Sequence, residues 1–200
     1  MKKTIRLTVL AAGFLALVAS AQDKPAATKK STAPAGPAMP KPAAEMKELR
    51  ALIGTWTTDE KYDPSPMMPS GGTGSGTITV RLGPGGFSVQ MEVRSKSAMG
   101  AFSGHGVMSW DPNAKVYKFA WVDSMTPGLV LETGHKEGEK LVFTGETFME
   151  GKKMAIKDVM SDFTPTSYTL MSFMNDGTGE KQVMTIKATK QEAAPPAPKK

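Results

Sequence analysis

The 200-residue sequence contains no cysteine, and histidine is scarce, with His105 and His135 as its two copies. The absence of cysteine excludes thiol catalysis, zinc sites with cysteine ligands and thiolate-bound clusters. It also excludes disulfide bonds, so a folded domain in this chain must be stabilised by its hydrophobic core. That requirement favours a domain of ordinary size over a small disulfide-rich one.

Residues 1–21 show the three-part pattern of a secretory signal peptide, with a basic start, an apolar stretch at about 7–18 and small residues at 19–21. The apolar stretch is shorter than the roughly 20 residues that a bilayer-spanning helix needs. An uncleaved membrane anchor is the alternative interpretation. The pattern favours an exported protein, periplasmic or secreted, with no transmembrane segment after signal cleavage.

Two segments are rich in Ala, Pro and Lys and poor in large apolar side chains, namely 22–44 and 191–200. Such segments have little to bury, so we predict a disordered linker and a disordered tail. Residues 45–190 between them are predicted to form one domain. The net charge of +6 comes from the ends of the chain, whereas this domain is nearly neutral. We therefore expect no nucleic-acid partner, and at most weak contact of the basic tails with anionic envelope surfaces.

The dominant period within the domain is two, which is typical of half-buried antiparallel strands. Apolar and polar residues alternate in 76–82 and in 87–94, and the Gly- and Pro-containing turn between them predicts a hairpin. In the second strand, Phe87 is expected to share the buried face with Val89. Further strands, separated by turn residues, are predicted at 102–110, 115–123, 128–135, 139–147, 153–162, 167–174 and 180–189.

One segment has the period of a helix and precedes the strands. Met46, Leu49 and Ile53 lie on one side of it, and Gly54 ends it. One short N-terminal helix and about ten strands predict an all-β fold, an antiparallel β-barrel, because closure removes exposed strand edges. A two-sheet sandwich is the alternative.

Residues 103–124 are predicted to form a hairpin whose register decides where His105 points, since a slip of one residue exchanges the two faces. With a four-residue loop at 111–114, Trp110 pairs with Lys115 and His105 points outward. With a three-residue loop, His105 points inward. A three-residue loop usually needs glycine in its left-handed position, which the sequence does not provide, so the four-residue loop is preferred.

The four-residue loop also places two glycines across from large rings. Gly106 then lies opposite Phe119, and Gly104 lies opposite Trp121. Glycine beneath a ring on the neighbouring strand is a stabilising arrangement in sheets. We therefore expect Phe119, Trp121 and Tyr117 on the buried face of the hairpin.

Three stretches of the sequence resemble a known family. Residues 48–56, ELRALIGTW, place Gly-x-Trp directly after a short helix, as in lipocalin-like barrels. Residues 102–128, FSGHGVMSWDPNAKVYKFAWVDSMTPG, with Gly134 and with DGTGEKQVMTI at 176–186, resemble the DUF1579 family of bacterial proteins over most of 45–190. The resemblance implies a calycin-like β-barrel and brings no established activity with it.

The sequence departs from the family pattern at a few positions. Trp110 stands where tyrosine is usual, and Lys157 stands where arginine is expected. Ala188 and Lys190 replace a Tyr-x-Arg ending. A function that rests on that arginine or tyrosine would therefore not carry over, whereas the predicted barrel is unaffected.

Inward-facing aromatic residues are the first candidates for ligand binding. Trp56 is expected to fill one end of the barrel, and its alternative role is the floor of a ligand cavity. Phe119 and Trp121 lie on the predicted inner face. Asp123 shares the face of Trp121, so it either caps the strand end together with Ser124 or anchors a ligand at the barrel mouth.

Histidine and methionine are the candidate metal ligands. His135 has the parity of Leu129 and Leu131, so it is expected to enter the barrel near a strand end, where a histidine could ligate haem iron. Most histidines in strands bind nothing, however. The fifteen methionines are scattered through the strands, which favours adaptable core packing over a copper site. No metal site and no cofactor are assigned.

No catalytic residue set emerges. The sequence has no nucleophile elbow, and the carboxylate pairs Glu146/Glu150 and Asp158/Asp162 would lie about 13 Å apart along a strand. That separation exceeds the one used by glycosidases. The sequence therefore favours a protein without enzymatic activity.

Three functional hypotheses follow. The first is an exported barrel that binds a small, mainly apolar ligand in its interior. The second is an enzyme with a polar site at the barrel mouth, where Asp123 and one histidine would act as acid and base. The third is a structural envelope protein with a solidly packed barrel. The candidate ligand-binding residues are Trp56, His105, Phe119, Trp121, Asp123 and His135.

Overall fold

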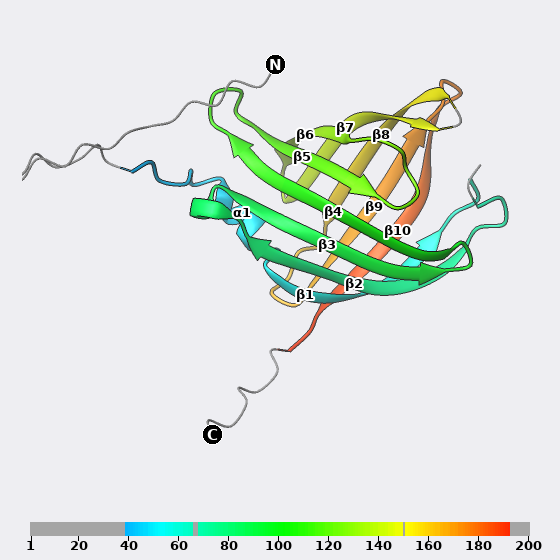
Figure 1. The fold of residues 1–200 in the computed structure, drawn as a ribbon, viewed down its shortest axis with the longest axis horizontal. Helices are drawn as coiled ribbons and strands as arrows, with labels where there is room; N and C mark the ends of the chain where they lie inside the picture. The colour runs from blue at the N-terminus through cyan, green and yellow to red at the C-terminus, as the bar shows by residue number, and fades with distance from the viewer. Residues whose placement is uncertain (1–38, 66–67, 150, 193–200) are drawn as a thin grey trace, which may run out of the picture. The chain divides into compact units, whose positions relative to one another are not determined.

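Ten strands of the described residues close into an antiparallel β-barrel (Figure 1). The structure is a computed structural model that describes residues 39–65, 68–149 and 151–192. A short α-helix, α1 (Met46–Arg50), precedes the barrel. The strands are β1 (Gly54–Tyr62), β2 (Gly72–Leu82), β3 (Ser88–Ser97), β4 (Gly100–Asp111), β5 (Val116–Asp123), β6 (Val130–Glu137), β7 (Lys140–Met149), β8 (Lys152–Ser161), β9 (Ser167–Asn175) and β10 (Glu180–Lys190).

The ends of the chain carry several sequence predictions that the structure does not reach. The predicted signal peptide at 1–21 and most of the predicted linker at 22–44 and tail at 191–200 lie outside the described residues. Export therefore stays a prediction. Within the described residues, no helix has the length and apolar character needed to cross a membrane.

Each strand pairs with its neighbours in sequence, and β1 closes the barrel by pairing with both β2 and β10. At the seam, Trp56 lies between Ile78 of β2 and Lys190 of β10. Because the sheet is one continuous barrel, the two-sheet alternative is wrong. The all-β antiparallel barrel with one short helix is confirmed.

The strand that closes the barrel, β1, is missing from the predicted strands. Its inner face carries Trp56, Thr58 and Glu60, of which the latter two are polar and still only 3% and 5% exposed. Polar residues at inward positions remove the apolar alternation by which a strand is recognised in sequence. The sequence therefore marks the start of β1 through Gly-x-Trp but not its extent.

The β4–β5 hairpin has the predicted face but a different register. Trp110 pairs with Tyr117, rather than with Lys115, and the four-residue loop comprises residues 112–115. Lys115 takes the left-handed conformation, with φ of 54°. The Asp111 carboxylate accepts hydrogen bonds from the backbone N–H groups of residues 113 and 114, which moves the turn one residue along the chain. A shift of two in pairing keeps the parity, so His105 points outward as predicted.

The predicted packing of rings over glycines is present despite this shift. A Cβ atom on Gly104 would lie 2.3 Å from the Trp121 ring, and one on Gly106 would lie 2.4 Å from the Phe119 ring. Gly106 pairs directly with Trp121, so the Phe119 ring reaches it diagonally. The glycines therefore make room for the aromatic rings inside the barrel.

The predicted hairpin of β2 and β3 is confirmed, and a tight turn connects its strands. A single 3-10 turn, η1 (Pro84–Gly86), links the strands, and Gly85 has a φ of 63° that glycine adopts without strain. Strand β3 begins at Ser88, after this turn, so Phe87 lies outside the strand and is 41% exposed. The expectation that Phe87 shares the buried face with Val89 is wrong.

Trp56 fills one end of the barrel, as predicted. Its ring is 1% exposed and packs edge-on against Tyr168 at a centroid distance of 4.9 Å. The indole Nε1–H donates a 2.8 Å hydrogen bond to the backbone carbonyl of Leu52. Lys190 places its ammonium 5.0 Å from the ring centroid, a distance typical of a cation–π contact. Lys190 of β10 thus supplies a cation at the seam with β1.

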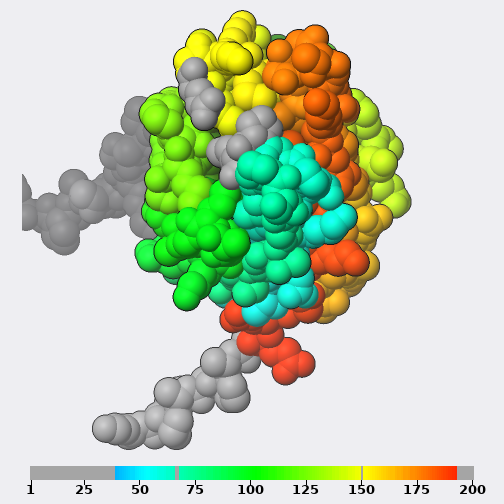
Figure 2. Space-filling view, turned by 90° about the vertical axis from the view of Figure 1, so that its right-hand side faces the viewer, coloured from blue at the N-terminus to red at the C-terminus, as the bar shows by residue number. Residues whose placement is uncertain are grey.

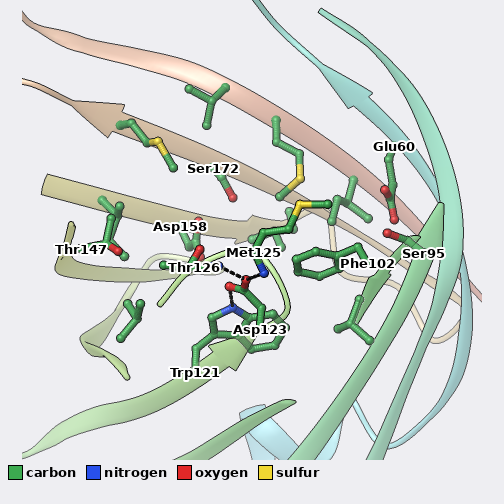
Figure 3. A pocket seen from close by; sticks show the side chains of 18 of the residues that line it. Glu60, Ser95, Phe102, Trp121, Asp123, Met125, Thr126, Thr147, Asp158 and Ser172 are labelled. Carbon is green, nitrogen blue, oxygen red and sulfur yellow. Dashed lines mark hydrogen bonds between the residues drawn. The ribbon is translucent and has the colours of Figure 1, made fainter. Parts of the chain in front are cut away.

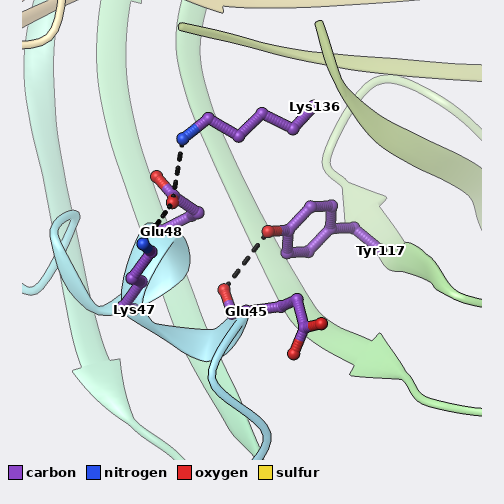
Figure 4. A network of polar contacts seen from close by, with 5 residues as sticks. All are labelled: Glu45, Lys47, Glu48, Tyr117 and Lys136. Carbon is purple, nitrogen blue, oxygen red and sulfur yellow. Dashed lines mark hydrogen bonds and ion pairs between the residues drawn. The ribbon is translucent and has the colours of Figure 1, made fainter. Parts of the chain in front are cut away.

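Helix α1 covers the same end of the barrel. Its apolar side chains Met46 and Leu49 are at most 2% exposed. Polar contacts hold the helix to β5 and β6 (Figure 4). The Tyr117 hydroxyl donates to the Glu45 carbonyl at 3.2 Å, and Lys136 Nζ donates to Glu48 Oε1 at 2.9 Å. Burial, together with the negative charges of Glu48 and Glu45, raises the pKa of Tyr117 to about 12. We call this end, filled by Trp56 and α1, the closed end.

Gly134 of β6 provides a test of this packing. A Cβ atom there would lie 2.5 Å from two ring atoms of Phe143, which is 2% exposed. We expect Gly134→Ala to lower the free energy of unfolding by about 1–3 kcal/mol, because the inserted methyl group overpacks the core. Urea denaturation measures the change.

The matched control removes the opposing ring. In the double variant Gly134→Ala/Phe143→Leu, the loss should be smaller than the sum of the two single losses, because the smaller side chain makes room for the methyl group. Strict additivity, or a Gly134→Ala protein as stable as the wild type, would contradict the packing described.

Candidate functional site

A cavity of about 270 Å³ lies inside the barrel, at the end opposite to Trp56, and all ten strands contribute to its lining. Residues of the β1–β2, β3–β4 and β5–β6 connections also line it, so the cavity reaches the loops at that end. Figure 2 looks onto this end, where segments near residues 75, 100 and 175 lie around the rim. We call it the open end. Trp56 does not line the cavity.

The lining is mainly apolar and unusually rich in methionine. Rings of Phe102, Phe119 and Trp121 form one wall, with centroids 5.7 Å apart for Phe119 and Trp121. Thioether side chains are flexible and polarizable, so they adapt to apolar ligands of different shapes. Among the described residues, nine methionines line the cavity, namely Met68, Met91, Met99, Met108, Met125, Met149, Met160, Met174 and Met184.

Asp123 lies at the open end, where β5 ends, and its carboxylate is fully engaged (Figure 3). Oδ2 accepts a 2.8 Å hydrogen bond from Trp121 Nε1, and Oδ1 accepts hydrogen bonds from the backbone N–H groups of Met125 and Thr126 at 2.7 and 2.6 Å. Ser124 adds two hydrogen bonds to Ser103 across the hairpin. Asp123 therefore caps the strand end and orients Trp121, although it also lines the cavity.

Two further acids line the cavity, on β6 and β8. Glu132 is 4% exposed, lines the cavity, and its Oε2 atom has no hydrogen-bond partner among the described residues. Asp158 also lines the cavity, and its strand position is opposite Ser172. The strand between the two acids, β7, carries Gly145 opposite Glu132. Because glycine has no side chain, the Glu132 side chain can lie across β7 toward β8.

Burial changes the protonation of both acids. Desolvation, together with the negative charge of Asp158, raises the pKa of Glu132 from 4.5 to about 8. Desolvation also raises the pKa of Asp158, and a hydrogen bond from Ser172 acts in the opposite direction. At neutral pH, Glu132 is therefore mostly protonated, an uncharged carboxylic acid facing an apolar cavity.

A fourth acid, Glu60 of β1, lies on another side of the cavity next to Ser95 (Figure 3). Both of its carboxylate oxygens have partners, because Thr58 donates to Oε1 at 3.0 Å and Tyr62 donates to Oε2 at 2.5 Å. Burial and the neighbouring Glu60 raise the pKa of Tyr62, so its hydroxyl stays a donor at all ordinary pH values. Glu60 is thus satisfied within the protein.

The six residues predicted from the sequence to bind a ligand lie in three different parts of the structure. Phe119, Trp121 and Asp123 line the cavity. Trp56 is packed at the closed end and does not reach it. His105 lies on the outer face of β4, paired with Val122 of β5 and Glu92 of β3.

His135 also lies outside, which corrects the expectation that it enters the barrel. It is exposed, and so is Leu131 of the same face, at 62%. The inward residues of β6 are instead Val130, Glu132 and Gly134. The two leucines gave the wrong parity, because β6 has its apolar side chains partly on the outer face. Asp123 and the two histidines are not brought together, so the proposed acid–base pair at the mouth does not form.

Sequence reasoning missed Glu60 and Glu132, and it considered Asp158 only as a carboxylate pair with Asp162. Each lies at an inward position with apolar or aromatic neighbours two residues away, such as Ile156 and Met160 on either side of Asp158. That parity is the available signal in the sequence. Glu132 and Asp158 lie on strands that are not adjacent, so their proximity follows only from the register of β7 between them. Within the described residues, no cluster of three or more acidic or histidine side chains could hold a metal ion.

The fold and the cavity define a calycin-like antiparallel β-barrel with a hollow interior. The DUF1579 family model, described as a protein of unknown function, matches residues 41–190, and the chain belongs to this family. Among curated proteins, none matches the chain at a significant level.

Solved structures with similar folds share little sequence with this chain. The S-type phycobiliprotein lyase CPES from Guillardia theta is 12% identical, with a TM-score of 0.52 over 76% of this chain and 95% of the lyase. A de novo designed fluorescence-activating β-barrel is 11% identical, with a TM-score of 0.40 over 71% of this chain and 95% of the design. The barrel EF1p2_mFAP2b bound to DFHBI is 12% identical, with a TM-score of 0.42 over 73% of this chain and 98% of that barrel. At such identities the likeness to the lyase shows the fold alone.

The raised pKa of Glu132 predicts a specific pH dependence of stability. Between pH 4.5 and about 8, the folded protein holds a proton on Glu132 that the unfolded chain has released. The unfolded state then binds fewer protons, so this group lowers the free energy of unfolding as the pH rises through that window. In Glu132→Gln this contribution is absent. The free energy of unfolding of the variant relative to wild type should therefore rise by up to about 1.4 kcal/mol per pH unit across the window.

Urea denaturation at several pH values between 5 and 9 measures this difference. Glu146→Gln is the control, because Glu146 is exposed on the neighbouring strand β7 and pairs with Lys153 at the surface. Its profile should run parallel to that of the wild type. A Glu132→Gln profile that also runs parallel to the wild type would show that Glu132 does not carry the shifted proton.

Proposed function

We propose that this protein binds a small, mainly apolar molecule in the cavity of its barrel. The observation that carries the proposal is the cavity itself, because its volume of about 270 Å³ is lined by methionine and aromatic side chains and reaches the loops of the open end. Binding sites for small molecules are typically concave, mainly apolar and furnished with a few polar groups. A solidly packed barrel, as a purely structural role would suggest, is not what the structure describes.

The N-terminal sequence supports a cellular location for this function. The basic start, apolar stretch and small residues of 1–21 favour export to the periplasm or the exterior, where the protein would meet its ligand. The basic segments at the two ends would at most favour weak contact with anionic envelope surfaces. Both statements belong to the proposal and rest on the sequence pattern.

Dye binding tests the proposal with two variants on the same strand. Ile156 lines the cavity and Ala155, its neighbour on β8, is exposed on the outer face. We expect the neutral dye N-phenyl-1-naphthylamine to bind the wild type with increased emission. Ile156→Trp fills the cavity and should weaken binding by roughly tenfold or more, whereas Ala155→Trp should leave it unchanged.

A second measurement identifies the natural occupant. Protein purified from its native host should release a small molecule on denaturation, detectable by mass spectrometry. Equal dye affinity in both variants would place the dye outside the cavity. Together with native preparations that contain no bound molecule, that result would exclude the proposed function.

A further inference from the structure

Carboxyl groups line the cavity without a basic counterpart among the described residues. Glu60, Asp123, Glu132 and Asp158 line it, and among the described lining residues there is no lysine, arginine or histidine. Four acids without a basic partner in a largely apolar cavity make an anionic ligand unfavourable. They favour a ligand that carries a hydrogen-bond donor or a positive charge.

These acids differ in what they have left to offer. Asp123 accepts three hydrogen bonds within the protein, and Glu60 accepts hydrogen bonds at both oxygens. Glu132 is different, because its Oε2 atom lacks a partner among the described residues although the residue is only 4% exposed. A buried, unpaired carboxyl oxygen is costly, which makes it a position where a ligand group would gain most.

The residue opposite Glu132 in the sheet leaves space for the Glu132 side chain. Gly145 is its partner on β7, and a Cβ atom there would lie 2.8 Å from Glu132 Cγ. A larger residue at 145 would push the Glu132 side chain away from its place. Asp158 follows on β8, close enough for its charge to raise the pKa of Glu132. The two carboxyls therefore act as one site, the Glu132–Asp158 pair.

Aromatic rings flank the pair. Phe119 is the partner of Glu132 on β5, and Phe143 is the partner of Asp158 on β7. Their ring centroids are 5.9 Å apart in an edge-to-face arrangement, and both rings line the cavity. Ring faces attract organic cations, most strongly where water is excluded. The register thus places two aromatic rings beside the pair, in the cavity that a ligand nitrogen would enter.

We propose that the natural ligand is a small amphipathic amine, whose cationic nitrogen binds the Glu132–Asp158 pair while its apolar part lies against the methionine and aromatic side chains. This inference rests on the proposed function and names the class of molecule that the cavity takes. An amine N–H donates to the unpaired Oε2 atom of Glu132, and its charge is balanced by the carboxylate. A fatty acid or another anionic amphiphile would meet no basic side chain among the described lining residues.

The proton balance of binding follows from the state of the free protein. A carboxylic acid at the pair loses its proton to the solvent when the ammonium group binds, so each bound amine replaces a proton. Binding should therefore strengthen as the pH rises through the pKa of Glu132, about 8. The acids Asp158, Glu60 and Asp123 face the same cavity and contribute no opposing charge. A primary alkyl amine itself stays protonated up to a pH of about 10.

Three probes of equal chain length test the ligand class on the wild-type protein. These are n-octylamine, n-octanol and sodium octanoate, each measured by isothermal titration calorimetry and by displacement of N-phenyl-1-naphthylamine. At pH 8.5 we expect n-octylamine to bind roughly tenfold or more tightly than n-octanol, and octanoate to bind most weakly. Titrations at pH 7, below the pKa of Glu132, in two buffers of different ionisation enthalpy should show proton release with n-octylamine and none with n-octanol.

Variants then assign the preference to the pair. In Glu132→Gln, n-octylamine should bind roughly tenfold or more weakly and lose its pH dependence, with n-octanol changed by less than about threefold. Asp158→Asn should also weaken the binding of n-octylamine. This variant takes the place of Glu132→Gln in the test if Glu132→Gln does not fold. Glu146→Gln, on the outer face of β7, should bind all three probes as the wild type does.

The outcomes separate this inference from the proposed function. If n-octanol binds and n-octylamine is no tighter, or octanoate binds as well as the amine, the amine class is wrong while the cavity still binds apolar molecules. Tight n-octylamine binding that Glu132→Gln and Asp158→Asn leave intact would also overturn the inference. If none of the three probes binds, the proposed function fails as well.

Discussion

The packing of Trp56 is the constraint on which the rest of the barrel depends. Its ring fills the closed end, is held by a hydrogen bond to the Leu52 carbonyl, and lies between Tyr168 and the ammonium group of Lys190. This contact joins β1 to β10 at the seam and docks the segment that follows α1. Because the closed end is solid, the empty space of the barrel is confined to the other half. Trp56 accordingly takes no part in the lining of the cavity.

The four acids of the cavity fall into two pairs with different roles in an otherwise apolar interior. Glu60 and Asp123 are satisfied by the protein and order β1 and the β5–β6 connection. The charge of Asp158 instead raises the cost of ionising Glu132, and Glu132 keeps an oxygen without a partner among the described residues. A carboxyl group that weakens the fold near neutral pH points to a role in binding. Gly145 maintains the space that this arrangement needs.

Much of the fold follows from the period of two in the sequence, since nine of the strands show it and closure follows from their number. The exception is β1, where Thr58 and Glu60 occupy inward positions. Registers were harder, because the Asp111 side chain moves the β4–β5 turn by hydrogen bonds that no periodicity reveals. For the site, the aromatic wall was predictable from parity. The Glu132–Asp158 pair was not, because it joins strands that are two apart.

The central claim is that the open half of the barrel is hollow and accepts apolar molecules, and the methionine methyl groups report on it directly. In a methyl-labelled sample titrated with n-octanol, NMR signals of Met91, Met108, Met160 and Met184, which line the cavity, should shift and saturate together. The signal of Met46, packed at the closed end, should stay in place. Cavity signals that do not move at high n-octanol concentration, or a shift of Met46 as large as theirs, would contradict the account.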